Sequence, residues 1–272
     1  MVGEPGQGGV VLRLHLSLRR LFRCVTSHRY LLNAHLPVAR VLSWSILSRF
    51  GPTGLYAQLE ERVPGRAPGD WDEADRPKAL ARVATTLAGF HSVRRRWPGS
   101  ILRPTRTSAV ERYMPRLIRR LQRLVPVIGS ETTERLTQCL RDRGSVLCSR
   151  QSYELIHGRV NDNNFLVDEE RAWAIDLATV QYGDAGRDLI HAIHRLCLGD
   201  EKQTEEFLSG YFSEVRGLDR KNFDLQRPFY SGEIHITTAA RFMRHWAEDS
   251  EKEQTREKVT RCVEDAFHHL ES

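Results

Sequence analysis

The segment at residues 156–167, followed nine residues later by Asp176, constrains the fold of this chain more than any other part of its sequence. It reads IHGRVNDNNFLV: an apolar approach, a polar loop that ends at Asn164, and a short apolar strand. A charged turn at residues 168–171 follows, and then a second apolar stretch that closes on Asp176. Two apolar strands around a polar turn predict a β-hairpin. We expect its base to hold Asn164 and Asp176, whose side-chain oxygens suit Mg²⁺.

The composition is that of an ordinary globular protein, with 272 residues, 40% hydrophobic and 28% charged. A chain of this length can form one large domain or two lobes. No apolar run approaches the roughly 18 residues of a membrane span, so we expect no membrane association. The acid-free stretch at residues 12–25 could be a transit peptide or a surface helix. Its apolar positions continue into the next segment, however, as those of a core element would.

The cysteines are odd in number and widely scattered: Cys24, Cys139, Cys148, Cys197 and Cys262. No two of them have the CxxC spacing of a zinc site, and they do not suggest a disulfide framework. Free thiols are typical of a reducing compartment, so we expect a cytoplasmic location.

The net charge of +6 is concentrated near the start of the chain, because residues 1–59 hold seven Arg and one acid, Glu4. A basic surface can attract nucleic acid or another anion. The sequence contains no nucleic-acid-binding signature, and its aromatic residues are not interleaved with the arginines as a stacking platform requires. We therefore do not expect a nucleic-acid partner. The triphosphate of a nucleotide, or simply a solvated surface, explains the charge as well.

The periodicity of apolar residues predicts strands first and helices later. Short β-branched or Pro-containing stretches predict extended segments at 10–14, 36–42 and 56–63, and residues 66–77 form a Pro- and Gly-rich junction. Apolar positions three and four apart predict helices at 18–34, 78–93, 111–125, 131–143 (capped by Ser130), 188–198, 202–215, 232–248 and 251–270. The pattern favours a small strand-bearing part followed by a mostly helical part.

Six segments occur in an order and spacing that is similar to the aminoglycoside phosphotransferase and choline kinase branch of the protein-kinase-like fold. They are LPVARVL at 36–42, LEERVPGR at 59–66, LAGFHSV at 87–93, the loop and strand at 157–167, ID at 175–176 and YGDAGRDL at 182–189. The resemblance implies an α+β, two-lobed fold. Its small N-terminal lobe, which could be truncated, would cover residues 1–65 with a hinge near 58–65. The helical C-terminal lobe would cover 66–272, with a catalytic loop at 157–164 and a metal segment at 174–178.

The resemblance also implies ATP and Mg²⁺ as cofactors and the hydroxyl of a small molecule as the phosphoryl acceptor. Asn164 and Asp176 match the two metal ligands of such enzymes. The adenine would meet backbone groups at residues Glu60, Glu61 and Arg62, and Arg13 would contact phosphate. His157 and Asp188 would brace the loop. A cationic acceptor could use Asp200, Glu201, Glu205 and Glu206.

Three elements of that family pattern are missing or altered. Arg159 stands where the family carries its catalytic Asp, and a guanidinium has only donors, so it cannot accept a proton. Asp162 should point elsewhere from a tight loop. The strand Lys and helix Glu that grip the phosphates are absent, because the first Lys is Lys78 and no acid lies between Glu4 and Glu60. The Gly-rich phosphate loop has too few residues ahead of Arg13, with only a Gly cluster at 6–9.

Two functions therefore stay open. One is ATP- and Mg²⁺-dependent phosphoryl transfer, impaired by Arg159, although Arg159 could stabilise charge on the transferring group. The other is a pseudokinase that binds nucleotide or ligand and acts through a protein partner. Histidines and a cysteine at 191, 194 and 197 drift around their helix, so we expect core packing there and no zinc site. The pair His268–His269 reads as part of a polar tail.

Overall fold

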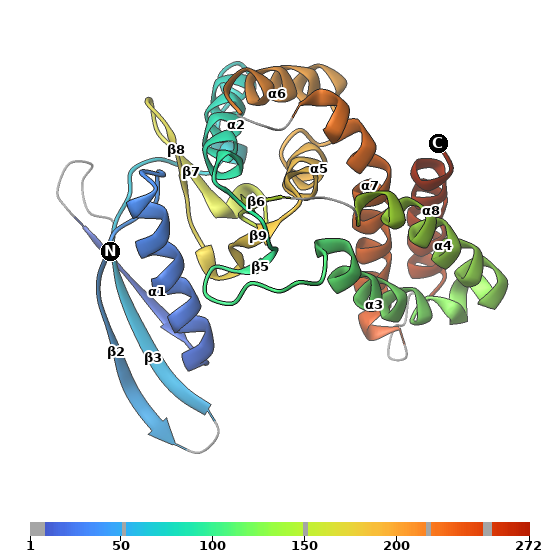
Figure 1. Ribbon diagram of the computed structural model, residues 1–272, viewed down its shortest axis with the longest axis horizontal. Coiled ribbons are helices and arrows are strands. Elements are labelled where there is room, and N and C mark those ends of the chain that lie inside the picture. The colour runs from blue at the N-terminus through green and yellow to red at the C-terminus, as the bar shows by residue number, and fades with distance from the viewer. Residues whose placement is uncertain (1–8, 51–52, 149–151, 216–218, 247–251) are drawn as a thin grey trace.

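The structure is a computed structural model that describes residues 9–50, 53–148, 152–215, 219–246 and 252–272. Its N-terminal part is a three-stranded antiparallel sheet in the order β1-β3-β2, with helix α1 packed on one face (Figure 1). Leu21 and Val25 of that helix bury against Tyr56 of the central strand. The bounds are β1 Val10–His15, α1 Leu18–Asn33, β2 Val41–Phe50 and β3 Thr53–Glu61.

The segments expected in this part are mostly confirmed. The strands at 10–14 and 56–63 and the helix at 18–34 correspond to β1, β3 and α1. The extended segment at 36–42 is divided in two. Val41 begins β2, whereas Val38 forms an isolated parallel bridge to Ala174, next to the segment that ends at Asp176. This bridge ties the N-terminal sheet region to the functional hairpin.

The remainder is mostly helical and surrounds two small sheets (Figure 1). Its helices are α2 Arg76–Ser92, α3 Ala109–Gln122, α4 Val125–Leu147, α5 Ala185–Arg195, α6 Glu201–Glu214, α7 Arg220–Phe242 and α8 Lys252–Glu271. Short 3-10 turns lie at η1 Pro68–Asp70, η2 Asp162–Asn164, η3 Leu177–Thr179 and η4 Met243–His245.

Two of these helices, α4 and α7, begin more than one turn earlier than the periodicity predicted. Helix α4 begins at Val125, and the expected start at Ser130 follows Gly129, whose φ of 78° interrupts the helix. Helix α7 begins at Arg220, where the side chain of Asp219 accepts the backbone N–H of Asn222, and it continues through Pro228. Proline inside a helix normally signals its end, which is why the expected start at residue 232 was wrong.

The functional hairpin forms as predicted. Strands β7 Phe165–Val167 and β8 Ala172–Ala174 pair antiparallel, with Leu166 opposite Trp173. The backbone of Gly65, at φ 107°, passes so close to Val167 that a Cβ would lie 2.6 Å from its carbonyl carbon, so only glycine fits. A second sheet in the order β4-β6-β9-β5 lies beside the hairpin, formed by β4 Arg94–Arg95, β5 Gly99–Ser100, β6 Tyr153–Ile156 and β9 Gln181–Gly183.

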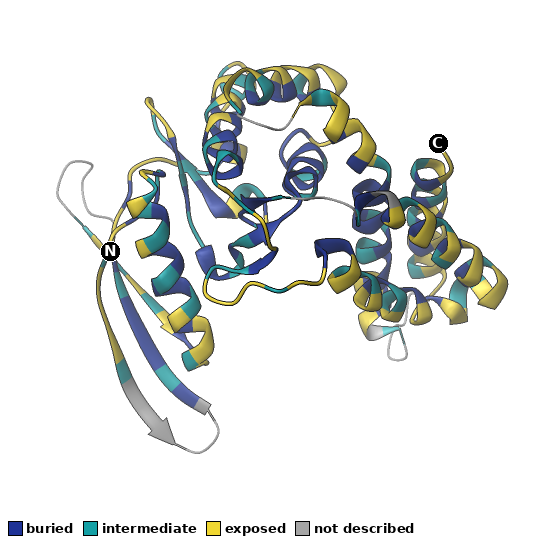
Figure 2. Ribbon diagram, in the orientation of Figure 1, coloured by how far each residue is buried: buried dark blue, intermediate teal, exposed yellow. Residues whose placement is uncertain are grey.

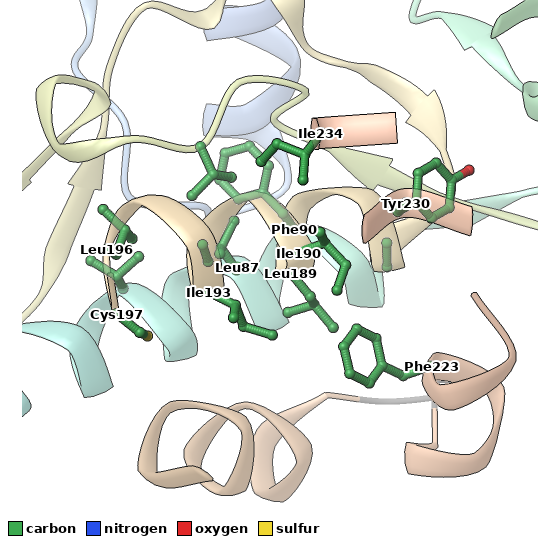
Figure 3. Packing of buried hydrophobic residues seen from close by; sticks show 14 of the residues in the cluster. Leu87, Phe90, Leu189, Ile190, Ile193, Leu196, Cys197, Phe223, Tyr230 and Ile234 are labelled. Carbon is green, nitrogen blue, oxygen red and sulfur yellow. The ribbon is translucent and has the colours of Figure 1, made fainter. Parts of the chain in front are cut away.

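The core is centred on α5, which is largely buried (Figure 2). Figure 3 shows Leu189 and Ile190 of this helix among Leu87 and Phe90 of α2 and Phe223 of α7. All five side chains are at most 1% exposed. Because α5 follows directly from β9, this packing fixes the position of Asp188 under the loop at residues 157–164.

Among the described residues, no helix combines the length and apolar character that crossing a lipid bilayer requires.

Candidate active site

The loop after β6 is held from below by the carboxylate of Asp188. Its Oδ2 accepts the backbone N–H of His157 at 2.6 Å, and its Oδ1 accepts that of Gly158 at 2.9 Å. His91 Nε2 lies 3.5 Å from Oδ2. Gly158 has φ 79°, and a Cβ there would lie 2.8 Å from the carbonyl oxygen of Thr179. The carboxylate therefore fixes the start of the loop in a conformation that favours glycine.

Burial and charge act in opposite directions on these groups. Burial raises the pKa of Asp188, but the bond from His91 and the charges of His91, His157 and Arg187 lower it overall. Burial is the largest cause acting on His157 and lowers the pKa of its ring. Its Nε2 lies 3.0 Å from the carbonyl oxygen of Ile175, to which it donates. This contact is the bracing role expected of His157, and it connects the loop to the segment that carries Asp176.

Asn164, Arg159 and Asp176 form one connected group. Asn164 Nδ2 donates to the carbonyl oxygen of Arg159 at 2.6 Å, which leaves the amide oxygen for another partner. Arg159 Nη1 donates to Asp176 Oδ2 at 3.3 Å, and Arg20 Nη2 of α1 donates to Oδ1 at 3.4 Å. The structure thus brings the two expected metal ligands close to Arg159. Both oxygens of Asp176, however, already contact a guanidinium.

The backbone of Asp176 is in the left-handed region, at φ 54° and ψ 55°. Such a conformation is uncommon for residues other than glycine and is found at functional sites. The side chain of Asp176 is 22% exposed, whereas those of Arg159 and Arg20 are each 56% exposed. Solvent-exposed ion pairs contribute only about 0–1 kcal/mol each. The guanidiniums therefore oppose a cation at Asp176 by charge, through contacts that are exposed and individually weak.

Asp162 faces away from this group. Its Oδ2 would lie 2.7 Å from a Cβ built on Gly69, so the side chain points to the 3-10 turn η1. Burial raises the pKa of Asp162, partly offset by Arg76 and by the backbone of Gly69. This orientation agrees with the expectation that Asp162 does not replace the missing base.

Arg13 finds a carboxylate partner that the sequence did not lead us to expect. Its Nε lies 2.8 Å from Oε1 of Glu60, which is 1% exposed and also accepts from Gln58 Nε2 at 2.6 Å. His28 Nε2 lies 3.4 Å from the same oxygen. Burial lowers the pKa of His28, but its bonds to Cys24 and Glu60 raise it to about 9. The carboxylate that pairs with Arg13 therefore belongs to the neighbouring strand β3, whereas the family pattern places such a carboxylate on a helix.

The other hinge residues have backbone partners of their own. Glu61 N–H donates to the carbonyl oxygen of Arg40 at 2.9 Å, and Arg62 N–H donates to that of Gly9 at 2.9 Å. The carboxylate of Glu61 also lies 3.8 Å from Arg40 Nε. Adenine binding at residues 60–62 stays a prediction.

A wide basic cleft next to the loop is the part of the site that sequence reasoning missed. It has a volume of about 690 Å³ and adjoins Gly158 and Thr179. We call it the arginine cleft after its seven arginines: Arg19, Arg23, Arg103, Arg112, Arg116, Arg120 and Arg187. The basic start of the chain and the basic side of the helix at 111–125 were both visible in the sequence. That they face each other was not.

The acids suggested for a cationic acceptor lie elsewhere. Asp200 caps α6 by accepting Gln203 N–H at 2.8 Å, and Glu205 pairs with Arg220 at 2.9 Å. None of the four acids, including Glu201 and Glu206, is among the residues that line the arginine cleft. The structure gives that suggestion no support.

Comparisons with known proteins bear on the fold. Solved structures with the same fold include a thermostable mutant of the aminoglycoside phosphotransferase APH(4)-Ia in its apo form (16% identity, 96% of this chain and 88% of the other, TM-score 0.66). Also similar is a choline/ethanolamine kinase family protein from Mesorhizobium loti (17% identity, 96% of this chain and 85% of the other, TM-score 0.64). Another is a microcompartment-associated aminopropanol kinase (20% identity, 98% of this chain and 85% of the other, TM-score 0.66). At these identities the likeness shows the fold alone. No curated protein matches the sequence.

The sequence profile of the phosphotransferase enzyme family matches residues 2–222, which include the loop, Asn164, Asp176 and the brace at Asp188. Since this match covers most of the chain and the fold agrees with it, the chain belongs to the phosphotransferase enzyme family.

Proposed function

We propose that this protein binds a nucleotide in the phosphotransferase fold but recruits Mg²⁺ poorly, so that phosphoryl transfer to a small-molecule hydroxyl is strongly impaired. The observation that carries the proposal is the pair of guanidiniums on Asp176, from Arg159 at 3.3 Å and Arg20 at 3.4 Å. Similar structures hold ADP with hygromycin B, or AMP-PNP with Ca²⁺, which supports nucleotide binding.

The donors for Mg²⁺ are chemically suitable, since Asn164 offers an amide oxygen and Asp176 a carboxylate. The local charge is not. With Arg159 and Arg20 in contact, the group around Asp176 carries +2 − 1 = +1, which disfavours a divalent cation. Asn164 and Asp176 would hold the ion, which would supply neutralisation of the phosphate charge. Arg159 also removes the group that would accept the hydroxyl proton, which typically contributes about 10²–10⁴-fold to the rate.

Phosphoryl transfer at a useful rate is the second candidate function. The retention of both Asn164 and Asp176 favours it, because a site without nucleotide chemistry needs neither. The exposure of the two arginines also favours it, since an exposed guanidinium can move away when metal arrives. A regulator without catalysis would instead act through a protein partner.

Titration with ATP, with and without Mg²⁺, separates these candidates. We expect ATP to bind the wild-type protein and Mg²⁺ to change its affinity by less than about threefold, because Asp176 is neutralised. Asp176→Asn should leave that small Mg²⁺ effect unchanged. A Mg²⁺ effect of tenfold or more that Asp176→Asn abolishes would show a working metal site and favour the second candidate. The absence of ATP binding under every condition would overturn both.

A further inference from the structure

The charge of the arginine cleft is almost uncompensated. Arg187 and Arg120 both lie near the buried carboxylate of Glu233, at 3.2 and 3.8 Å. Within the described part of the chain, the other five arginines have no carboxylate within ion-pair distance. No Asp or Glu is among the described residues that line the cleft. Counting the buried carboxylates of Glu233 and Asp188, which both act on Arg187, seven positive charges meet two negative charges, 7 − 2 = +5.

These arginines come from both parts of the molecule and lie close enough to affect one another. Arg19 and Arg23 are on α1, whereas Arg112, Arg116 and Arg120 are on α3. Burial lowers the pKa of Arg23, and the charges of Arg19, Arg112 and Arg116 lower it further. Like charges gathered in one cleft repel one another, and an anion bound among them removes that repulsion.

The remaining lining suits a small organic molecule. Gln181 Nε2 donates to the hydroxyl of Tyr113 at 2.8 Å, and the Arg187 guanidinium stacks over the Tyr113 ring at 4.7 Å. Phe22 and Leu102 supply apolar surface. A volume of about 690 Å³ lies within the range of about 300–1,000 Å³ typical of small-ligand sites.

We propose that the arginine cleft is the acceptor site and that its ligand is a small polyanion, an organic molecule with two or more phosphate or carboxylate groups. Arginine binds both groups through paired N–H donors, and seven arginines suit a multiply charged ligand. The inference rests on the proposed function only in calling the site an acceptor site. The hinge residues 60–62 and Arg13 do not line the cleft, so it is distinct from the expected nucleotide site.

The test compares two double variants, on α3 and the residue that caps its C-terminus, that remove the same charge. Arg112→Gln/Arg116→Gln removes two cleft arginines, and Arg119→Gln/Arg123→Gln removes two exposed arginines outside the lining. Pyrophosphate and citrate are titrated calorimetrically at low salt without nucleotide, beside the cationic hygromycin B. We expect both anions to bind the wild-type protein. Their affinity for the cleft variant should be at least tenfold lower, and their affinity for the control variant should stay within about twofold of wild type. Hygromycin B should not bind.

Four results would overturn the proposal. In the first, hygromycin B binds and the anions do not. In the second, both double variants weaken the binding of the anions equally, which indicates diffuse surface charge. A single-stranded oligonucleotide could bind more tightly than either anion, which indicates a nucleic-acid surface. In the fourth, pyrophosphate competes with ATP and the cleft variant binds both ligands more weakly, which would assign the cleft to nucleotide phosphates. If ATP fails to bind while pyrophosphate binds, the proposed function fails and the anion site remains.

A separate observation concerns three histidines that converge from different helices, His194 of α5, His235 of α7 and His269 of α8, here called the histidine cluster. One ligand nitrogen of each lies within 4.8 Å of the other two. The rings of His194 and His235 meet edge to face at 4.9 Å, and those of His235 and His269 stack at 5.4 Å. The local expectations for His194 and His269, core packing and a polar tail, missed this convergence.

The bonding of His235 leaves one nitrogen available. Its Nδ1 lies 3.5 Å from Oδ2 of Asp265, whereas its Nε2 is buried and has no hydrogen-bond partner in the described chain. Metal-bound histidines commonly donate their other N–H to a carboxylate in this way. An unpartnered buried nitrogen otherwise carries a desolvation cost.

The charges and donor atoms around the cluster also bear on a metal. Arg195 near His194 and Arg227 near His269 oppose a cation, and Asp265 favours one. Three imidazoles with a nearby carboxylate match the ligand preference of Zn²⁺.

We infer that the histidine cluster binds Zn²⁺ and ties α8 to α5 and α7. Tetrahedral zinc would hold the nitrogens about 3.4 Å apart, so the rings must close by about 1 Å. Tag-free protein is titrated with Zn²⁺ against a chromophoric chelator. We expect one equivalent to bind and the melting temperature to rise.

His235→Gln and His194→Gln should each lower the affinity for Zn²⁺ at least a hundredfold. His268→Gln, at the residue next to His269 in sequence, should not lower it. Melting temperatures in EDTA show whether each variant still folds. Zinc binding that is absent in wild type, unchanged in both cluster variants, or lost equally in His268→Gln would overturn the inference.

Discussion

Replacing Arg159 with Asp and Arg20 with Gln should make ATP binding depend on Mg²⁺ by at least tenfold and raise ATP turnover about 10²-fold or more. The double substitution changes the charge around Asp176 from +1 to −2, counting the new carboxylate. It frees both oxygens of Asp176 for metal. It also restores a proton acceptor at the position where the family carries one. Calorimetry with and without Mg²⁺ measures the first effect, and ATP hydrolysis measures the second.

Two companion variants separate metal recruitment from proton transfer. Arg159→Gln/Arg20→Gln removes the same guanidiniums without adding a base, so Mg²⁺ dependence should appear with little gain in rate. Arg171→Asp/Arg29→Gln makes the same net charge change at exposed positions away from Asp176 and should change neither quantity. If Mg²⁺ still has no effect after Arg159 and Arg20 are replaced, Asp176 is not a metal ligand.

The local parts of the site were predictable from the sequence because short-range patterns encode them. The hairpin β7–β8 follows from two apolar strands around a charged turn, and its bracing follows from His157 and Asp188 in their motifs. The boundaries of α4 and α7 were less predictable. Gly129 does interrupt α4, and the helical residues before it were not expected. Pro228 lies inside α7, where tertiary packing overrides its tendency to end a helix.

The contacts that decide function join residues far apart in the chain. Arg20 lies 156 residues before Asp176, and the periodicity of neither segment predicts their ion pair. The same holds for the arginine cleft, whose arginines on α1 and α3 lie far apart in the chain. Sequence patterns fix which face of a helix is basic, but the fold determines what that face meets.

Asp188→Asn should lower the free energy of unfolding by about 3 kcal/mol at pH 7, because it disrupts a buried and charged hydrogen-bond acceptor. The carboxylate is 1% exposed and accepts N–H groups from His157 and Gly158. An amide keeps only one acceptor oxygen, so its NH₂ group would face one of these donors. Urea unfolding at pH 7 measures the loss. Glu205→Gln, which breaks an exposed pair with Arg220, should cost less than about 1 kcal/mol.

The pH dependence of that loss tests its electrostatic origin. The folded pKa of Asp188 is lowered below its ordinary value, since His91, His157 and Arg187 outweigh burial. A lowered carboxylate pKa contributes stability that is fully present above the unfolded pKa of about 3.9 and disappears as pH falls through the folded pKa. The difference between wild type and Asp188→Asn should therefore be constant from pH 8 to about pH 5 and shrink below about pH 4. A difference that persists unchanged at pH 3 would mean that shape, and not the charge of Asp188, holds the loop.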